Sequence, residues 1–277
     1  MGTMRTFLLG IFTPDHGGNH TPTPKKIPRI DTFMKTKILS LLLLTSLLCR
    51  PAFCGEIHDA AKSGDLEKVM ALLKDNPNLV SSKDDNGWTP LHFAAHEGHK
   101  DVAELLLANK AEVNAKNNKG DTPLHDAVDK GYKDVAKLLL TNKAEVNVKD
   151  IRYNTPLHFA AAGGYKDEAE LLLANKAEVN TTNFTGWTPL HWAAANGHKD
   201  VAELLLANKA EVNAKDNDGA TPLLFAATMG HKDVAELLLA NKAEVNIEVH
   251  GTTPYHWAVA EGHNDVAELL RQHGGHE

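Results

Sequence analysis

Cysteine is almost absent from this chain. Its 277 residues include two cysteines, Cys49 and Cys54, and both lie in the first 54 residues. The sequence after Cys54 therefore offers no disulfide, no cysteine nucleophile and no thiolate ligand for zinc. Packing and hydrogen bonds must stabilise that part of the protein.

Serine is nearly as scarce, since after residue 54 it occurs only at Ser63, Ser81 and Ser82. No G-x-S-x-G nucleophile motif, phosphate-binding loop or dinucleotide-binding glycine pattern is present. The acidic residues are plentiful, but they recur with the polar face of each helix, which is typical of a solvated surface. We therefore predict a protein that is not an enzyme and needs no cofactor.

A membrane-spanning run is also lacking. The longest apolar run, residues 38–48, is too short for a span of about 20 residues. Two lysines precede it, and Ala52-Phe53-Cys54 follow it. This order is typical of a secretory signal peptide, which we predict over residues 34–54 with cleavage after Cys54. We expect a periplasmic or secreted protein, with an uncleaved anchor as the alternative.

Residues 1–33 precede that signal and are rich in proline and glycine. Such a segment is predicted to be disordered. Because a signal peptide is recognised poorly when it does not begin the chain, we expect translation to start at Met34 rather than at Met1.

Charge is unevenly distributed along the chain. Residues 1–54 carry seven basic and two acidic residues, whereas the remainder carries 22 basic and 34 acidic residues. An acidic surface disfavours nucleic acid and anionic membranes as ligands. It favours an unknown protein partner with a basic patch.

One motif recurs along the chain after residue 55. A Thr-Pro pair returns four times at a spacing of 33 residues and once at 32, at Thr89, Thr122, Thr155, Thr188, Thr221 and Thr253. A fixed period of this size is the mark of stacked structural repeats. The chain is therefore predicted to form a solenoid and not an ordinary globular domain.

The unit of residues 186–218 shows what each repeat does. Thr188 can cap a helix that begins at proline, and Gly197 ends that helix. A second helix with an apolar stripe follows, and the polar run 215–219 forms a turn. A single unit cannot bury its stripe, so neighbouring units must stack.

The motifs TPLHFA, TPLHDA and TPLHWA, with the weaker TPLLFA and TPYHWA, give the chain its family likeness. The sequence resembles ankyrin-repeat proteins, of the exported bacterial type. The resemblance implies an all-α repeat solenoid, elongated and curved, in which helix pairs alternate with β-hairpin loops. It divides the domain 55–277 into an N-terminal cap at 56–85, repeats at 87–119, 120–152, 153–185, 186–218 and 219–250, and a C-terminal cap at 251–277.

Several positions depart from the common unit. Tyr153 stands where other units have glycine, which predicts a different turn in that loop. Asn109 and its copies are expected to adopt the left-handed conformation that ends a helix. Glu168 replaces a valine and is expected to place a polar group near the core.

The chain has sixteen histidines. The resemblance implies that those of the TPLH motif join neighbouring repeats by hydrogen bonds, at His92, His125, His158, His191 and His256. His92, His96 and His99 have a spacing that could bind zinc, but two of the three belong to the repeat pattern. We therefore predict no metal site.

The second helix scarcely changes between units, so it is architecture, whereas loop tips and first-helix ends vary. Variable positions are where ankyrin-repeat proteins contact partners, and large apolar or aromatic residues there favour binding. For Trp88 and Trp187 the alternative is that they brace adjacent loops. The candidate partner-binding residues are Trp88, Asp121, Ile151, Arg152, Tyr153, Asn154, Phe184, Trp187 and Met229.

Three functions are compatible with this pattern. The first is a monomeric module that binds another protein through its loop tips and concave face. The second is an assembly or stability factor for an exported enzyme, and the third is a structural spacer without a specific ligand.

Overall fold

The computed structural model describes residues 51–276, which contain fourteen α helices, one short 3-10 helix, η1 (Pro77–Ser81), and no β strand. The predicted all-α repeat architecture is confirmed. The first helices of the units are α2 (Pro51–Ser63), α4 (Pro90–His96), α6 (Pro123–Asp129), α8 (Pro156–Gly163), α10 (Pro189–Ala195), α12 (Pro222–Thr228) and α14 (Pro254–Ala260). The second helices are α3 (Leu66–Asp75), α5 (Lys100–Ala108), α7 (Lys133–Thr141), α9 (Lys166–Ala174), α11 (Lys199–Ala207), α13 (Lys232–Ala240) and α15 (Asn264–Gln272).

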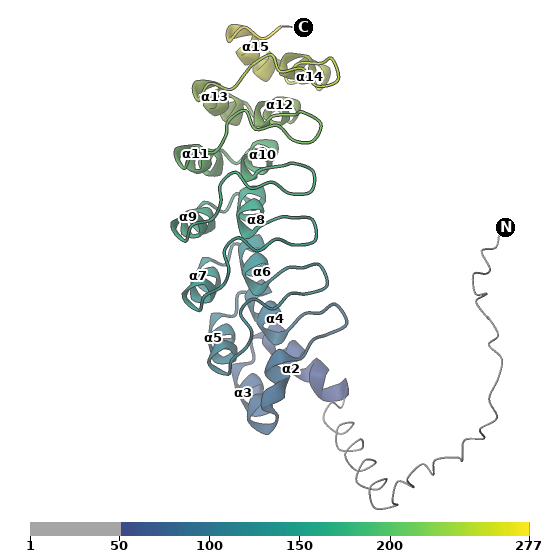
Figure 1. Cartoon of the computed structure of the whole chain (residues 1–277), viewed down its shortest axis with the longest axis vertical. Coiled ribbons are helices and arrows are strands. Elements are labelled where there is room, and N and C mark those ends of the chain that lie inside the picture. The colour runs from purple at the N-terminus through teal and green to yellow at the C-terminus, as the bar shows by residue number, and fades with distance from the viewer. Residues whose placement is uncertain (1–50, 277) are drawn as a thin grey trace, which may run out of the picture. The chain divides into compact units, whose positions relative to one another are not determined.

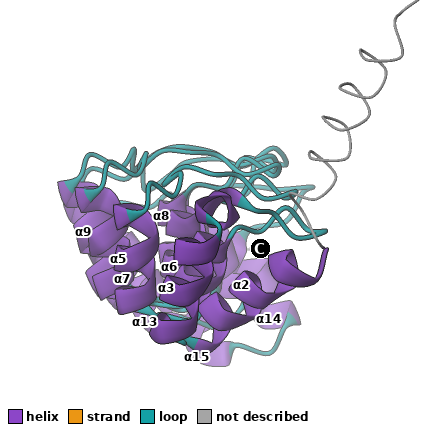
Figure 2. Cartoon of the chain, turned by 90° about the horizontal axis from the view of Figure 1, so that it is seen from below, coloured by secondary structure: helices purple, strands orange, loops and turns teal. Residues whose placement is uncertain are grey.

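The helices of this part of the chain stack in two columns, as Figure 1 shows. Each first helix packs against the first helices of the neighbouring units and against its own second helix. The long loops that join one unit to the next project to the side of the first helices, away from the second column (Figure 1), and most of them gather above the helices in Figure 2. The repeated sequence thus produces one face made of loops and another made of second helices.

Small side chains allow the first helices to lie close together. In α10, Ala193 and Ala194 are fully buried, and in α11 Val201, Ala202 and Leu205 are buried behind them. The same positions are buried in the other four full repeats, whereas Met70 and Val259 are exposed at the equivalent places in the terminal units. One core runs through the whole stack. Because each unit contributes one layer, the stability of the array is the sum of such layers and their interfaces.

A buried histidine joins each of four units to the next. In α4 the Thr89 amide donates to His92 Nδ1 at 3.1 Å, and Thr89 Oγ1 lies 2.8 Å from the same nitrogen. Since Nδ1 accepts from the amide, the neutral ring carries its proton on Nε2, which donates to the Asp121 carbonyl at 3.2 Å. The predicted ties between repeats are confirmed for His92, His125, His158 and His191.

The prediction fails for His256, which is exposed. Among the described residues no further helix pair follows α15, so no loop of a next unit accepts a bond from His256. The Thr253 hydroxyl donates to the His276 carbonyl at 2.8 Å. A second set of ties was not predicted. The histidines before three of the second helices, His99, His198 and His231, reach back to the preceding unit, as when His198 Nε2 donates to the Ala162 carbonyl at 3.0 Å.

The threonine at the start of these helices allows a matched test of the histidine tie. Thr188→Val is expected to lower the free energy of unfolding by about 1–2 kcal/mol, because it removes the cap and the contact with His191. Thr221→Val is expected to change it by less than about 0.5 kcal/mol. The Thr221 hydroxyl is already buried without a partner, because Leu224 replaces the histidine.

Urea unfolding of the two variants measures this difference. Equal losses of stability would show that the threonine hydroxyl does not act through the histidine.

Each loop tip is closed by an Asp or Asn side chain. Asp84 Oδ1 accepts the amides of Asn86 and Trp88, and the same pair of bonds occurs at Asn117, Asp150, Asn183 and Asp216. Adjacent tips are joined by single amide-to-carbonyl bonds, such as Phe184 to Arg152 at 2.8 Å. The last loop is one residue shorter and is closed instead by the bridge between Val249 and Thr252, which accounts for the final period of 32.

Two expectations about turns were wrong. The loop that contains Tyr153 has the same hydrogen bonds as the others, because Tyr153 adopts the positive φ of 65° that glycine adopts elsewhere. At the helix ends Lys110, not Asn109, is left-handed, with φ 67°. Asn109 instead donates its side-chain amide to the Leu105 carbonyl at 2.9 Å, which satisfies a free carbonyl of the last turn. Glu168 is buried, as expected.

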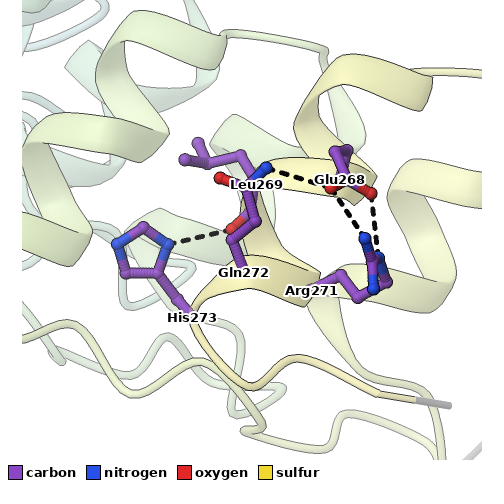
Figure 3. Close-up of polar contacts among 5 residues, drawn as sticks. All are labelled: Glu268, Leu269, Arg271, Gln272 and His273. Atoms are coloured by element: carbon purple, nitrogen blue, oxygen red, sulfur yellow. Dashed lines mark hydrogen bonds and ion pairs between the residues drawn. The ribbon is translucent and has the colours of Figure 1, made fainter.

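The last helix, α15, has the polar outer face of a terminal cap. Glu268 accepts two bonds from Arg271 at 2.8 Å and one from Gln272 at 3.0 Å (Figure 3). These contacts hold the pKa of the Glu268 carboxyl well below its usual value. His273 Nδ1 donates to the Leu269 carbonyl at 2.9 Å, which caps the helix end.

At the other end, the predictions for residues 1–33 and for most of 34–54 lie outside the described residues. Helix α2 begins at Pro51, so the predicted cleavage point after Cys54 falls inside a helix. Among the described helices, none combines the length and the apolar character needed to span a membrane.

Candidate functional site

The loops and the first helices enclose an open groove of about 1220 Å³. Side chains from α4, α6, α8 and α10 line one side of it, and the loops that precede these helices line the other. The groove extends across the units of residues 87–119 to 186–218.

Two large apolar side chains stand at adjacent loop tips beside the groove. Ile151 is 65% exposed and Phe184 is 72% exposed. Their backbones lie in a hydrogen-bonded row, because Ile151 donates to the Lys119 carbonyl at 2.9 Å and Phe184 donates to Arg152. Neither side chain contributes to the core, so they present a fixed apolar pair to the solvent.

The two tryptophans before Thr-Pro lie deeper in the groove and are half-buried. The Trp187 ring packs between Trp192 and Phe225, with centroid distances of 4.7 and 4.4 Å. Its Nε1 donates to Asp216 Oδ2 of the next loop at 3.2 Å. Trp187 therefore braces adjacent loops, which is the alternative that the sequence left open.

Trp88 occupies the equivalent place three units earlier, but its surroundings differ. Its ring packs on Phe93 at 5.0 Å and on His96 at 5.3 Å. The residue that corresponds to Phe225 is Asp126, so no second aromatic ring covers Trp88 from the following unit. Part of the groove beside Trp88 is consequently lined by a carboxyl group.

Asp126 is the residue that sequence reasoning missed. The other five units have an aromatic residue after the TPLH histidine or its replacement, at Phe93, Phe159, Trp192, Phe225 and Trp257. The aspartate at a position that is aromatic in the other five units could have identified Asp126 as unusual from the sequence alone. Asp126 is only 7% exposed, and its Oδ2 is buried without a hydrogen-bond partner.

The surroundings of Asp126 disfavour its charged form. Burial is the main cause, and the carboxylates of Asp121 and Asp129 add to it, so the pKa of Asp126 is raised well above its usual value. Other groove carboxyls have partners. Asp129 pairs with Lys130 at 2.9 Å, Asp121 accepts from Asn117 at 3.3 Å, and Asp150 closes its own turn.

Seven of the nine predicted binding residues line this one groove, namely Trp88, Asp121, Ile151, Arg152, Asn154, Phe184 and Trp187. Tyr153 lies outside it, 53% exposed, with Lys149 Nζ 5.9 Å from the ring centroid. Met229 is 52% exposed at the end of α12 and is also not part of the groove.

The buried histidines of the TPLH motif, of which His125 and His158 also line the groove, tie neighbouring units together. Burial lowers the pKa of His92 and of His158 to about 4, and it lowers those of His125 and His191 in the same direction. Within the described residues, no three His, Cys, Asp or Glu side chains are placed to hold a metal ion.

Comparison with known proteins agrees with the fold. A family model described as ankyrin repeats in three copies matches residues 57–150, 149–216 and 209–277. Human protein phosphatase 1 regulatory subunit 27 is 33% identical over 82 residues, which is 30% of this chain and 49% of that protein.

Two other relatives match shorter stretches. The human NAD-capped RNA hydrolase NUDT12 is 36% identical over 52 residues, 19% of this chain and 11% of that protein. A probable E3 ubiquitin-protein ligase of rice, XBOS32, is 45% identical over 49 residues, 17% of this chain and 10% of that protein. The chain thus spans about half of the first relative and about a tenth of the others.

These relatives are human and plant proteins, so they do not support the exported bacterial type that the sequence led us to expect. The matched stretches are short, at 49 to 82 residues. The family model, in contrast, matches residues 57–277 in three successive copies, which is most of the sequence. On that evidence, this chain belongs to the ankyrin-repeat family.

Proposed function

We propose that this protein is a non-enzymatic interaction module that binds a segment of a partner protein in the groove. The observation that carries the proposal is the pair Ile151 and Phe184, which are exposed on adjacent tips of a hydrogen-bonded row of loops. A row fixed before binding loses little conformational freedom when a partner arrives. Large apolar side chains that become buried when a partner binds contribute much of the binding energy at protein interfaces.

The test compares two double variants of the full chain. Ile151→Ser with Phe184→Ser removes the apolar pair at the groove, whereas Tyr153→Ser with Met229→Ser removes exposed residues of similar size outside it. Proteins from the native host are captured on each variant and on the parent, and the affinity of any captured protein is then measured. Circular dichroism and urea unfolding establish that both variants are folded.

The groove variant is expected to bind the captured protein at least tenfold more weakly, a loss of about 1.4 kcal/mol. The control variant is expected to bind it as the parent does. Equal binding by all three proteins, or no specific capture, would favour the spacer function over the interaction module.

A second candidate is regulation of a client enzyme, as in an assembly or stability factor. It is favoured by the likeness to a protein named as a phosphatase regulatory subunit. The two candidates use the same groove and differ in outcome. A captured enzyme whose activity changes when the chain binds would support the second.

Export remains part of the proposal and rests on residues 34–54 alone. Amino-terminal sequencing of the protein from its native host is expected to find Gly55 as the first residue. An amino terminus at Met1 or Met34 in the accumulated protein would contradict cleavage.

A further inference from the structure

The unit of Trp187 can be compared with the unit of Trp88 to show which aromatic side chain is missing from the groove. In the unit of Trp187, an aromatic cluster is completed by Phe225 from the following unit. In the unit of Trp88, that place belongs to Asp126, which is too small to fill the space of a ring. A planar group supplied from outside could therefore occupy the position beside Trp88.

The Asp126 carboxyl at that position favours a positively charged ligand group. The Asp126 carboxyl is more than nine-tenths buried, lines the groove and has an oxygen without a hydrogen-bond partner. A buried carboxyl without a partner is costly, so it gains from a donor that carries positive charge. The basic residues of the groove do not form an ion pair with Asp126. Lys130 pairs with Asp129 instead, and Lys119 and Arg152 form no ion pair with any of the described residues.

A guanidinium group meets both requirements. It is planar, it stacks on aromatic faces and it offers several donors in a fixed fork, whereas an ammonium is a strongly hydrated point charge. Trp88 and Phe159 line the same groove as Asp126, and the Phe159 ring lies 5.6 Å from that of His125, which precedes Asp126. A bare metal ion fits less well, because no group of three metal ligands surrounds this carboxyl among the described residues.

We propose that the partner segment places an arginine side chain beside Trp88, with its guanidinium group donating to the Asp126 carboxylate. This inference deepens the proposed function, on which it rests, by naming the chemistry of the group that is recognised. The acidic balance of the repeat region agrees with a basic partner. Ile151 and Phe184 then provide apolar contacts for residues that flank the arginine.

Trp192 offers a further contact for the same segment. Its indole Nε1 is buried at the groove without a hydrogen-bond partner, two units beyond Asp126. An indole N–H only donates, so it requires an acceptor such as a carbonyl oxygen. The groove therefore has an unpaired acceptor and an unpaired donor on the same side, as expected for a surface that binds an extended chain.

The test uses three synthetic peptides that differ in one side chain. They are acetyl-Gly-Leu-Arg-Leu-Gly-amide and its versions with lysine or citrulline in place of arginine. Citrulline keeps the planar shape of arginine without its charge. Binding to the full chain is measured by nuclear magnetic resonance titration, with the Trp88 indole as reporter and Trp257, which lies outside the groove, as internal control.

The arginine peptide is expected to bind at least tenfold more tightly than the citrulline peptide and to shift the Trp88 indole but not that of Trp257. Asp126→Asn, which keeps the side-chain shape, is expected to abolish that tenfold preference. Asp167→Asn, which removes an exposed carboxylate on α9, is expected to leave it unchanged. Equal affinity for arginine and citrulline, or an unaltered preference in Asp126→Asn, would overturn the inference.

These outcomes are separable from those of the proposed function. A partner that is lost with Ile151→Ser and Phe184→Ser but held equally by Asp126→Asn would contradict the arginine site alone. A clear arginine preference without any captured partner would contradict the interaction module alone.

Discussion

Replacing Asp126 by phenylalanine is expected to raise the free energy of unfolding by about 2 kcal/mol at pH 7. The change removes a buried carboxyl whose Oδ2 has no partner. It also restores the aromatic residue that Phe93 and Phe159 provide in the neighbouring units. Each of those rings lies 5.6 Å from the histidine of the preceding unit, which indicates that the stack has room for a ring there.

Urea unfolding at pH 7 measures the change in the free energy of unfolding. The variant Asp126→Asn separates the loss of the charged carboxyl from the gain of an aromatic ring. The amide removes the charge without adding a ring, so it is expected to stabilise less than phenylalanine. If Asp126→Phe is no more stable than the parent, then either the carboxyl is satisfied in solution or the ring does not fit. Increased stability in Asp126→Asn would leave only the second explanation.

This prediction and the arginine site are two consequences of one residue. A buried, unpaired carboxyl destabilises the free protein, and a partner that supplies the missing donor recovers that loss on binding. Asp126→Phe is therefore expected to be more stable and to lose the arginine preference. Such an exchange between stability and binding is common at functional positions.

Acidification from pH 7 to pH 4.5 is expected to lower the free energy of unfolding by about 2 kcal/mol for each of His92 and His158. Their folded pKa is about 4, below the value of 6.5 expected in the unfolded chain. The unfolded chain therefore binds more protons between these values. Stability is fully present above pH 6.5 and is lost as the pH falls towards 4.

The physical reason is that the folded state excludes the second proton. Burial disfavours the charged ring, and in each case Nδ1 already accepts the amide of the capping threonine. Asp126 acts in the opposite direction, because its pKa is raised and protonation on acidification favours the folded state. The loss of stability with falling pH is therefore expected to be steeper in Asp126→Phe than in the parent.

Urea unfolding at several pH values, together with nuclear magnetic resonance titration of the histidine rings, tests this expectation. Ring resonances of His92 and His158 that titrate near pH 6.5 in the folded protein would contradict it. So would a stability that is unchanged between pH 7 and pH 4.5 in the Asp126→Phe variant.

The sequence alone determined most of the architecture. The 33-residue period and the Thr-Pro helix starts predicted the helix pairs and their stacking. The ties made by His92, His125, His158 and His191 were expected from the family resemblance that the TPLH motif carries. These features are readable because each is a local pattern that repeats, and because each unit contacts only its neighbours. The same comparison between units selected nine candidate binding residues, and seven of them line one groove.

Only the tertiary structure decided which side chains meet across units. The bond from Trp187 to Asp216, the adjacency of Ile151 and Phe184, and the unpaired carboxyl of Asp126 all depend on residues about 29 to 33 positions away. Burial and hydrogen bonding at such positions are set by the neighbouring layer and not by the local sequence. The backbone conformation of Tyr153 also depends on its surroundings. The hydrogen bonds of its loop hold it at a positive φ, which a bulky residue otherwise disfavours.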